Sequence, residues 1–306
     1  LMEAHLERLA KDAAALGIDV DPGTLRSFAA DAIPDEAEDG ALRLTVTRGP
    51  GPRGVAPRAL GEATLISKFD PGKPAFPAPP IRLACSDILR NPSAPSSRRK
   101  TLSYTDAVIG TQRAKAAGFD DALYFTPGGH AACTSIANIF GRFGETLVTP
   151  PLEDGVVDGI MRAWLLKTAP DAGFKVEVAS LSAQALARAD ALYLTNSLQL
   201  IRAVEGLDDI RFDAALPVSL VELFTDLLNA LLPAERRHIR VSLAMRCPRT
   251  WQPDVLDKVL DVLWRRLGGE RHRDPDRSRQ PHEDEANPFR RDTEQPVCRI
   301  GVDELE

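Results

Sequence analysis

The amino-acid sequence predicts a mixed α/β protein with two domains and a C-terminal extension. Segments with strand-like alternation and segments with helical periodicity interleave along most of the chain. A proline-rich stretch over residues 70–80 predicts an interdomain connection, because proline fixes the backbone and removes a hydrogen-bond donor. From residue 268 the chain is dominated by charged, polar and proline residues, which predicts disorder.

The first predicted domain, residues 1–72, is small. Residues 1–16 have helical periodicity, with Leu6, Leu9 and Ala13 on one face. A second helix is expected over 22–32, and strands over 41–47 and 62–68 are expected to form a hairpin around a loop rich in Gly, Pro and Arg. No capping residue precedes the first helix, so we expect this domain to be incomplete at its N-terminus.

Residues 73–80 form the predicted linker, and residues 81–232 form a larger domain of alternating strands and helices. Its expected strands are 81–86, 122–126, 175–179 and 191–195, and its expected helices are 106–118, 159–168, 182–188 and 217–232. The extension, residues 233–306, contains an amphipathic helix over 253–267 and is expected to be largely disordered from 268.

Composition excludes several classes of function. The chain has 306 residues, of which 43% are hydrophobic, enough for a buried core. A net charge of −6 gives no reason to expect a nucleic-acid partner. No apolar run approaches the ~20 residues that span a bilayer, and no secretory signal is evident. The four cysteines lack metal-ligand spacing, so we expect no metal and a cytoplasmic protein in a reducing compartment.

Four local features contain residues suited to chemistry. Lys100 follows two arginines and precedes a helix, where it is either a catalytic amine or a solvated lysine. The run from Gly128 to Phe140 forms a glycine turn followed by strands, whose ordinary interpretation is a hairpin. Gly159 precedes a helix whose free amides suit a phosphate, although most helix starts bind none. Asn196 and Ser197 end a strand, either as phosphate donors or as a plain turn.

The order and spacing of these features resemble the class IV aminotransferases, which are fold-type IV enzymes dependent on pyridoxal phosphate (PLP). The resemblance extends over residues 1–232 and includes His5-Leu6-Glu7-Arg8-Leu9, Arg48-Gly49-Pro50-Gly51-Pro52-Arg53-Gly54 and Leu147-Val148-Thr149-Pro150-Pro151-Leu152. It implies a small α/β domain and a larger domain with a mixed sheet, and PLP as cofactor. By resemblance we also expect a homodimer and a small-molecule amino substrate.

The resemblance assigns five residues to the cofactor phosphate. Arg8 matches the arginine that pairs with the phosphate, a task suited to a guanidinium. Ile160 and Met161 match the backbone donors at the start of a helix, and Asn196 with Ser197 match the later phosphate contacts.

Three further residues are assigned to catalysis, substrate binding and the cofactor ring. Lys100 matches the lysine that forms the Schiff base and moves the α-proton, and Arg53 lies in a loop that reaches the substrate carboxylate. Cys133 stands where the family usually has a glutamate beside the pyridine nitrogen. The interpretations are a variant enzyme with a less electrophilic cofactor, a catalytically impaired PLP-binding protein, or a local misalignment.

Within this family the residues favour a lyase that converts 4-amino-4-deoxychorismate to 4-aminobenzoate and pyruvate for folate synthesis. The loop at 48–54, the Asp158-Gly159-Ile160-Met161-Arg162 run and the spacing from Lys100 to Cys133 resemble the lyase. An aminotransferase acting on branched-chain or D-amino acids is the alternative, because substrate choice depends on a few contacts.

Overall fold

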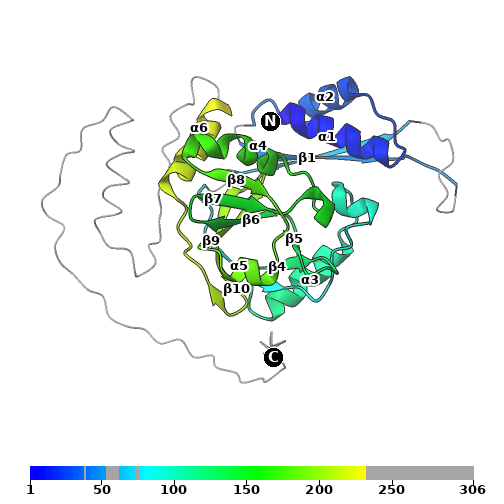
Figure 1. Ribbon diagram of the computed structural model, residues 1–306. Helices are drawn as coiled ribbons and strands as arrows, with labels where there is room; N and C mark the ends of the chain where they lie inside the picture. The colour runs from blue at the N-terminus through cyan, green and yellow to red at the C-terminus, as the bar shows by residue number, and fades with distance from the viewer. Residues whose placement is uncertain (38, 53–61, 73–75, 232–306) are drawn as a thin grey trace, which may run out of the picture. The chain divides into compact units, whose positions relative to one another are not determined.

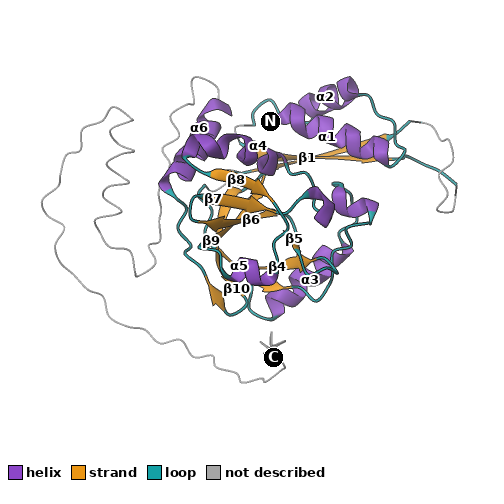
Figure 2. Ribbon diagram, in the orientation of Figure 1, coloured by secondary structure: helices purple, strands orange, loops and turns teal. Residues whose placement is uncertain are grey.

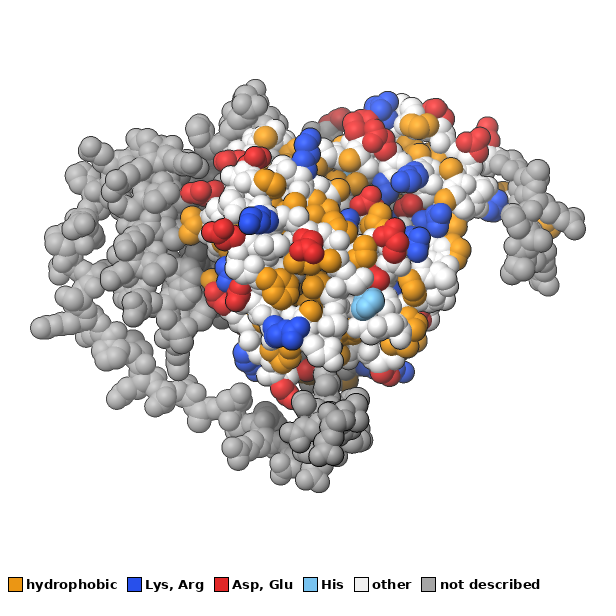
Figure 3. Space-filling view, viewed as in Figure 1, with side chains coloured by type: hydrophobic (Ala, Val, Ile, Leu, Met, Phe, Trp, Pro, Cys, Tyr) orange, Lys and Arg blue, Asp and Glu red, His pale blue; other side chains and the backbone are white. Residues whose placement is uncertain are grey.

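The computed structural model describes residues 1–231 except 38, 53–61 and 73–75 (Figure 1). The expected helix over 253–267 and the expected disorder from 268 lie outside the described residues. Helices and strands alternate as the sequence predicts, so the mixed α/β class is confirmed (Figure 2). On the face drawn in Figure 3, acidic and basic side chains are interspersed with apolar ones.

The N-terminal elements form a layer of two helices on a two-stranded hairpin. Their bounds are α1 (Met2–Ala15), α2 (Pro22–Asp31), β1 (Gly40–Thr47) and β2 (Thr64–Pro71). Asp21 caps α2, because its side chain accepts the amide hydrogen of Thr24 at 2.7 Å. The antiparallel strands pack under buried Leu6, Leu25 and Ala29, which form the core of this layer. The predicted helices and hairpin are therefore confirmed.

The rest of the described chain is built on a nine-stranded sheet. Its strands are β3 (Ile81–Cys85), β4 (Asp121–Phe125), β5 (Ala131–Thr134), β6 (Asn138–Phe143), β7 (Thr146–Thr149), β8 (Lys175–Val178), β9 (Ala191–Asn196), β10 (Leu200–Leu207) and β11 (Ile210–Arg211). β3 lies parallel to β4 and β10, and the pairs β4–β5, β5–β6, β6–β9 and β9–β10 are antiparallel. These pairings close six strands into a ring, which β7, β8 and β11 extend.

Two apolar clusters stabilise the sheet from its two faces. One contains Leu83, Leu123, Ile139, Leu192 and Val204, one residue from each of five ring strands, so this cluster fills the ring. The other lies between the opposite face and the helices α4 (Ile160–Thr168) and α6 (Val218–Leu231), and it contains Phe140, Met161, Leu165, Tyr193 and Phe224. Figure 1 shows both helices on the same side of the strands.

The remaining helices connect the strands. They are α3 (Thr105–Ala116), α5 (Ala183–Ala187) and the 3₁₀ turns η1 (Pro95–Arg98), η2 (Leu152–Asp154) and η3 (Ala169–Ala172). Ser182 caps α5, since its hydroxyl accepts the amide hydrogen of Ala185 at 3.1 Å. Within the described ranges, no helix combines the length and apolar character that crossing a bilayer requires.

Candidate active site

One polar face of α1 contacts three separate loops of the large sheet. His5, Arg8 and Asp12 are three and four residues apart, so their side chains lie on the same side of the helix. His5 Nε2 lies 3.0 Å from Ser197 Oγ, Arg8 Nη1 donates to the Asp158 carbonyl at 3.0 Å, and Asp12 Oδ2 accepts the Lys100 amide hydrogen at 3.0 Å. Because all three contacts are made from one face of α1, the three loops lie close together along that helix.

Lys100 lies between η1 and α3, and both its backbone and its amine are held. Asp12, only 8% exposed, fixes the backbone by accepting the amide hydrogen. Lys100 Nζ lies 2.5 Å from Tyr104 Oη and 5.2 Å from the centre of the Tyr104 ring. These two distances require the amine to lie beyond the hydroxyl, near the extension of the Tyr104 C–O bond, and not above the face of the ring. The contact is therefore a hydrogen bond and not a cation–π contact.

At the start of α4, the first backbone amide groups donate no hydrogen bond to a capping side chain. Gly159 is the N-cap residue, and no side chain caps the helix. The first hydrogen bond of the helix is from the Ala163 amide to the Gly159 carbonyl at 2.9 Å, so the amides of Ile160 and Met161 precede the helical ladder. Such amides, together with the helix dipole, favour an anion.

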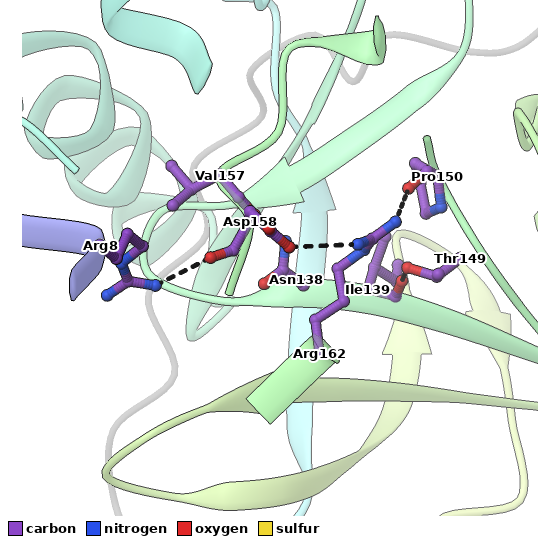
Figure 4. A network of polar contacts seen from close by, with 8 residues as sticks. All are labelled: Arg8, Asn138, Ile139, Thr149, Pro150, Val157, Asp158 and Arg162. Atoms are coloured by element: carbon purple, nitrogen blue, oxygen red, sulfur yellow. Dashed lines mark hydrogen bonds and ion pairs between the residues drawn. The ribbon is translucent and has the colours of Figure 1, made fainter. Parts of the chain in front are cut away.

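Asn138 lies against Gly159, so a larger residue at position 159 would have to displace the Asn138 side chain. A Cβ added there would come within 2.1 Å of Asn138 Oδ1. The Asn138 amide in turn donates to the Val157 carbonyl at 2.9 Å and fixes the segment that leads into α4 (Figure 4). The sheet strand β6 therefore positions the start of the helix directly.

Two arginines lie on either side of Asp158 (Figure 4). Arg8 donates to its carbonyl, whereas Arg162 Nη1 lies 3.6 Å from Asp158 Oδ1 and Arg162 Nη2 donates to the Pro150 carbonyl at 2.9 Å. Burial lowers the pKa of both arginines, and the nearby carboxylates oppose this effect. A guanidinium remains charged at neutral pH, so Arg8 brings a fixed positive charge to the start of α4.

Ser197 lies in the turn between β9 and β10. Asn196 forms this turn, since its Oδ1 accepts the amide hydrogens of Leu198 at 3.0 Å and Gln199 at 2.8 Å. Ser197 Oγ lies within hydrogen-bond distance of His5 Nε2. Burial, followed by the charges of Arg8, the N-terminal ammonium and Lys100, lowers the pKa of His5 to about 4. The imidazole is therefore neutral at pH 7.

Cys133 lies on β5 opposite Asn138, is buried and packs in a cluster with Val156. Burial raises the pKa of its thiol, while the positive charge of Arg90 opposes the rise. Arg90 itself is fixed by two carbonyls, donating from Nε to Gly155 at 3.0 Å and from Nη2 to Ser97 at 2.7 Å. Because the ordinary thiol pKa is already near 8.5, Cys133 is a neutral thiol at pH 7.

The structure thus gathers most of the residues singled out in the sequence around α1. Lys100, Ser197 and the amides of Ile160 and Met161 lie on the loops that α1 contacts, and Asn196 is occupied with its own turn. Cys133 lies within electrostatic reach of Lys100. Arg53 lies outside the described residues, so its predicted contact with substrate is not tested by the structure.

Sequence reasoning missed His5, Asp12 and Tyr104 as site residues. A signal existed for the first two, because the polar positions 5, 8 and 12 share one side of the helix, next to its apolar stripe. The four-residue spacing from Lys100 to Tyr104 offered a weaker one. In the described part of the chain, no group of three His, Cys, Asp or Glu side chains could hold a metal.

Comparisons with known proteins agree with this geometry. The family model of amino-transferase class IV matches residues 1–207. A Methanocaldococcus jannaschii protein provisionally named a branched-chain-amino-acid aminotransferase is 29% identical over 68% of this chain and 74% of its own length.

Two solved structures named as 4-amino-4-deoxychorismate lyases also resemble the chain. A Legionella pneumophila protein provisionally named a 4-amino-4-deoxychorismate lyase is 33% identical, with a TM-score of 0.66, over 74% of this chain and 84% of that one. The 4-amino-4-deoxychorismate lyase of Pseudomonas aeruginosa is 28% identical, with a TM-score of 0.64, over 76% of this chain and 85% of that one.

The matched family model covers more than half of the chain, and its enzymes depend on PLP. The fold and the family together define a fold-type IV PLP enzyme. This chain belongs to the class IV aminotransferases, whose relatives here are aminotransferases and aminodeoxychorismate lyases.

Proposed function

We propose that this chain is a PLP-dependent lyase that converts 4-amino-4-deoxychorismate to 4-aminobenzoate and pyruvate. The run from Asp158 to Arg162, which contains the start of α4, resembles the lyase and supports the lyase over an aminotransferase. The two lyase structures, at 33% and 28% identity, favour the same choice.

The described residues fit the chemistry of PLP. A phosphate requires positive charge and hydrogen-bond donors, which Arg8, the uncapped amides of Ile160 and Met161, and the Ser197 hydroxyl provide. The close approach of Asn138 to Gly159 shows that the start of α4 is tightly fitted. We assign these residues to the phosphate and give Asn196 the role of shaping the turn that presents Ser197.

PLP, when bound, supplies an aldehyde that condenses with amines and a ring that withdraws electrons from the substrate α-carbon. Lys100 Nζ is the amine that we assign to the aldehyde and to the substrate α-proton. Tyr104 Oη holds this amine at 2.5 Å, and Asp12 fixes the backbone behind it. The proton therefore moves at a group that is anchored at both ends of its side chain.

The neutral Cys133 thiol is compatible with elimination. A carboxylate beside the pyridine nitrogen keeps that nitrogen protonated and strengthens electron withdrawal, which a thiol does not. Both reactions remove the substrate α-proton and leave an electron pair on the α-carbon. Elimination discharges the pair into the departing enolpyruvyl oxygen, and the product becomes aromatic. The weaker electron sink at Cys133 is therefore compatible with the lyase reaction.

An aminotransferase acting on branched-chain or D-amino acids is the second candidate, favoured by the 29% identical Methanocaldococcus relative. The same thiol also suits a PLP-binding protein with impaired catalysis. Both alternatives give products different from those of the lyase.

The test supplies the PLP-loaded protein with aminodeoxychorismate and measures 4-aminobenzoate by fluorescence and pyruvate enzymatically. We expect equal amounts of the two products without any keto-acid acceptor. The parallel assay supplies D-alanine or leucine with 2-oxoglutarate and measures glutamate. Glutamate formation without 4-aminobenzoate would identify an aminotransferase, and no product in either assay would identify an impaired protein.

We further propose that the enzyme acts in the cytoplasm, in folate biosynthesis, and as a homodimer on a small amino substrate. Light scattering coupled to size exclusion, on the PLP-loaded protein, measures the oligomeric state. A mass of twice the 33.3 kDa chain is expected, and a mass of one chain would contradict the dimer.

A further inference from the structure

The contact between His5 and Ser197 joins residues 192 positions apart in the sequence. His5 precedes Arg8 by one helical turn, so its side chain lies beside the guanidinium that contacts the segment leading into α4. Ser197 consequently lies next to the same anion-favouring region as the amides of Ile160 and Met161.

Hydrogen-bond chemistry limits how His5 and Ser197 can share a proton. A neutral imidazole has one donor nitrogen and one acceptor nitrogen, and a serine hydroxyl has one hydrogen and two lone pairs. If Nε2 accepted from Ser197, the hydroxyl hydrogen would be used and no donor would remain for a phosphoryl oxygen. If Nε2 donates to Ser197 Oγ, the hydroxyl hydrogen is free to bind the phosphate.

The surroundings of His5 disfavour its protonated form. Burial is the largest cause of its lowered pKa, and the charges of Arg8 and Lys100 add to it. A phosphate placed among Arg8, Lys100 and the start of α4 would be an acceptor for the Ser197 hydroxyl, not a donor.

We propose that His5 is a positioning residue that donates from Nε2 to Ser197 Oγ and so directs the Ser197 hydroxyl hydrogen to the cofactor phosphate. The proposal rests on the proposed PLP site, and it adds to that site a residue that acts through Ser197. It explains why the hydroxyl of a turn residue is fixed by a helix 192 positions away.

The test compares binding of PLP with binding of pyridoxal, which lacks the phosphate, by visible absorbance. His5→Leu and Ser197→Ala are each expected to weaken PLP binding about tenfold, the effect of one hydrogen bond to a charged group. Pyridoxal binding should be unchanged in both variants. The double variant should bind PLP as tightly as whichever single variant has the lower affinity, because the two residues act as one unit.

Two further variants provide rescue and a control. His5→Gln places an amide N–H near the position of Nε2 and should restore most of the PLP affinity, whereas His5→Asn, whose amide lies nearer the position of Nδ1, should not. His130→Gln, in the turn before β5 where His130 contacts Asp154, should bind PLP as the wild type does. This Gln-against-Asn comparison also decides the question if His5→Leu fails to fold by circular dichroism.

Additive losses in the double variant, equal losses for PLP and pyridoxal, or equal affinities for His5→Gln and His5→Asn would overturn the positioning role. These outcomes are distinguishable from failure of the proposed function. Failure of the proposed PLP site would show as a wild-type protein that binds no PLP, and the inference would fall with it, whereas a chain that binds PLP but lacks lyase activity would leave the inference testable.

Discussion

At the residue scale, the site depends on buried polar groups whose partners come from distant parts of the chain. Asp12 is a charged side chain that is only 8% exposed, and its Oδ2 accepts the backbone amide hydrogen of Lys100. Buried charges are costly unless hydrogen bonds compensate them. Asp12 is therefore retained for the position of the loop rather than for stability alone.

Asp12→Ala removes the acceptor and leaves the Lys100 amide without its partner. We expect a loss of about 1–3 kcal/mol in the free energy of unfolding, the cost of an unsatisfied buried group, together with weaker binding of both PLP and pyridoxal. Urea unfolding and absorbance titration measure the two effects. Asp12→Asn, which keeps an acceptor oxygen, should lose less. The control is exposed Asp19→Ala, which should stay within about 0.5 kcal/mol of wild type.

In the proposed site, Cys133→Glu would place a carboxylate where the family usually has a glutamate, beside the ring nitrogen. We expect amino transfer to increase about tenfold, corresponding to about 1.4 kcal/mol of transition-state stabilisation, because electron withdrawal by the ring becomes stronger. Glutamate formation from 2-oxoglutarate measures the change. The matched Cys133→Ser variant keeps a neutral group and should not show it. A folded Cys133→Glu protein that loses all activity would mean that the thiol itself takes part in the reaction.

At the scale of single elements, the start of α4 is positioned by β6 through Asn138. The sequence predicted this helix and its free amides from Gly159 and the apolar run that follows. It could not predict that Asn138 Oδ1 fills the space of a side chain at position 159, because that contact requires the sheet to be formed first.

Gly159→Ala tests this fit. The backbone there has φ −71° and ψ 135°, which alanine adopts easily, so the effect arises from the contact with Asn138 and not from strain. We expect a loss of about 1–3 kcal/mol in stability, as for other overpacked sites, and weaker binding of PLP relative to pyridoxal. Gly128→Ala is the matched control, since its Cβ would meet only Thr126 Oγ1 at 3.6 Å. Equal behaviour of the two variants would contradict the account.

Strand prediction from the sequence failed where pairing is non-local. β7, β10 and β11 were not predicted as strands, although β10 closes the ring by pairing with β3 and β9. β10 begins at Leu200 with φ 60°, and its mainly buried residues give no regular alternation. Its parallel partner β3 lies more than 100 positions earlier, so local patterning contains no sign of the pairing.

At the scale of the whole molecule, the fold class could be predicted from the sequence, whereas the contacts between the candidate site positions could not. Lys100, Ser197 and the α4 amides follow a linear order that the sequence displays. The roles of His5, Asp12 and Tyr104 arise only when α1 lies across the loops, because each depends on a partner atom of the folded chain.

The stability of the described fold should depend on pH through His5. Its pKa is lowered from 6.5 to about 4 in the folded state, so the unfolded chain binds a proton first as pH falls. The stability contributed by the neutral imidazole is complete above about pH 6.5 and is lost between about 6.5 and 4. Urea unfolding across this range should show a shallower decline for His5→Gln than for wild type. Identical declines would contradict the low pKa.

The central claim is that Lys100 binds the aldehyde of PLP. The most direct measurement reduces the PLP-loaded protein with sodium borohydride, digests it and locates the pyridoxyl group by peptide mass spectrometry. The account predicts modification of Lys100 in the wild type and loss of that peptide adduct in Lys100→Ala. Modification of another lysine such as Lys115, or no specific adduct in the wild type, would contradict it.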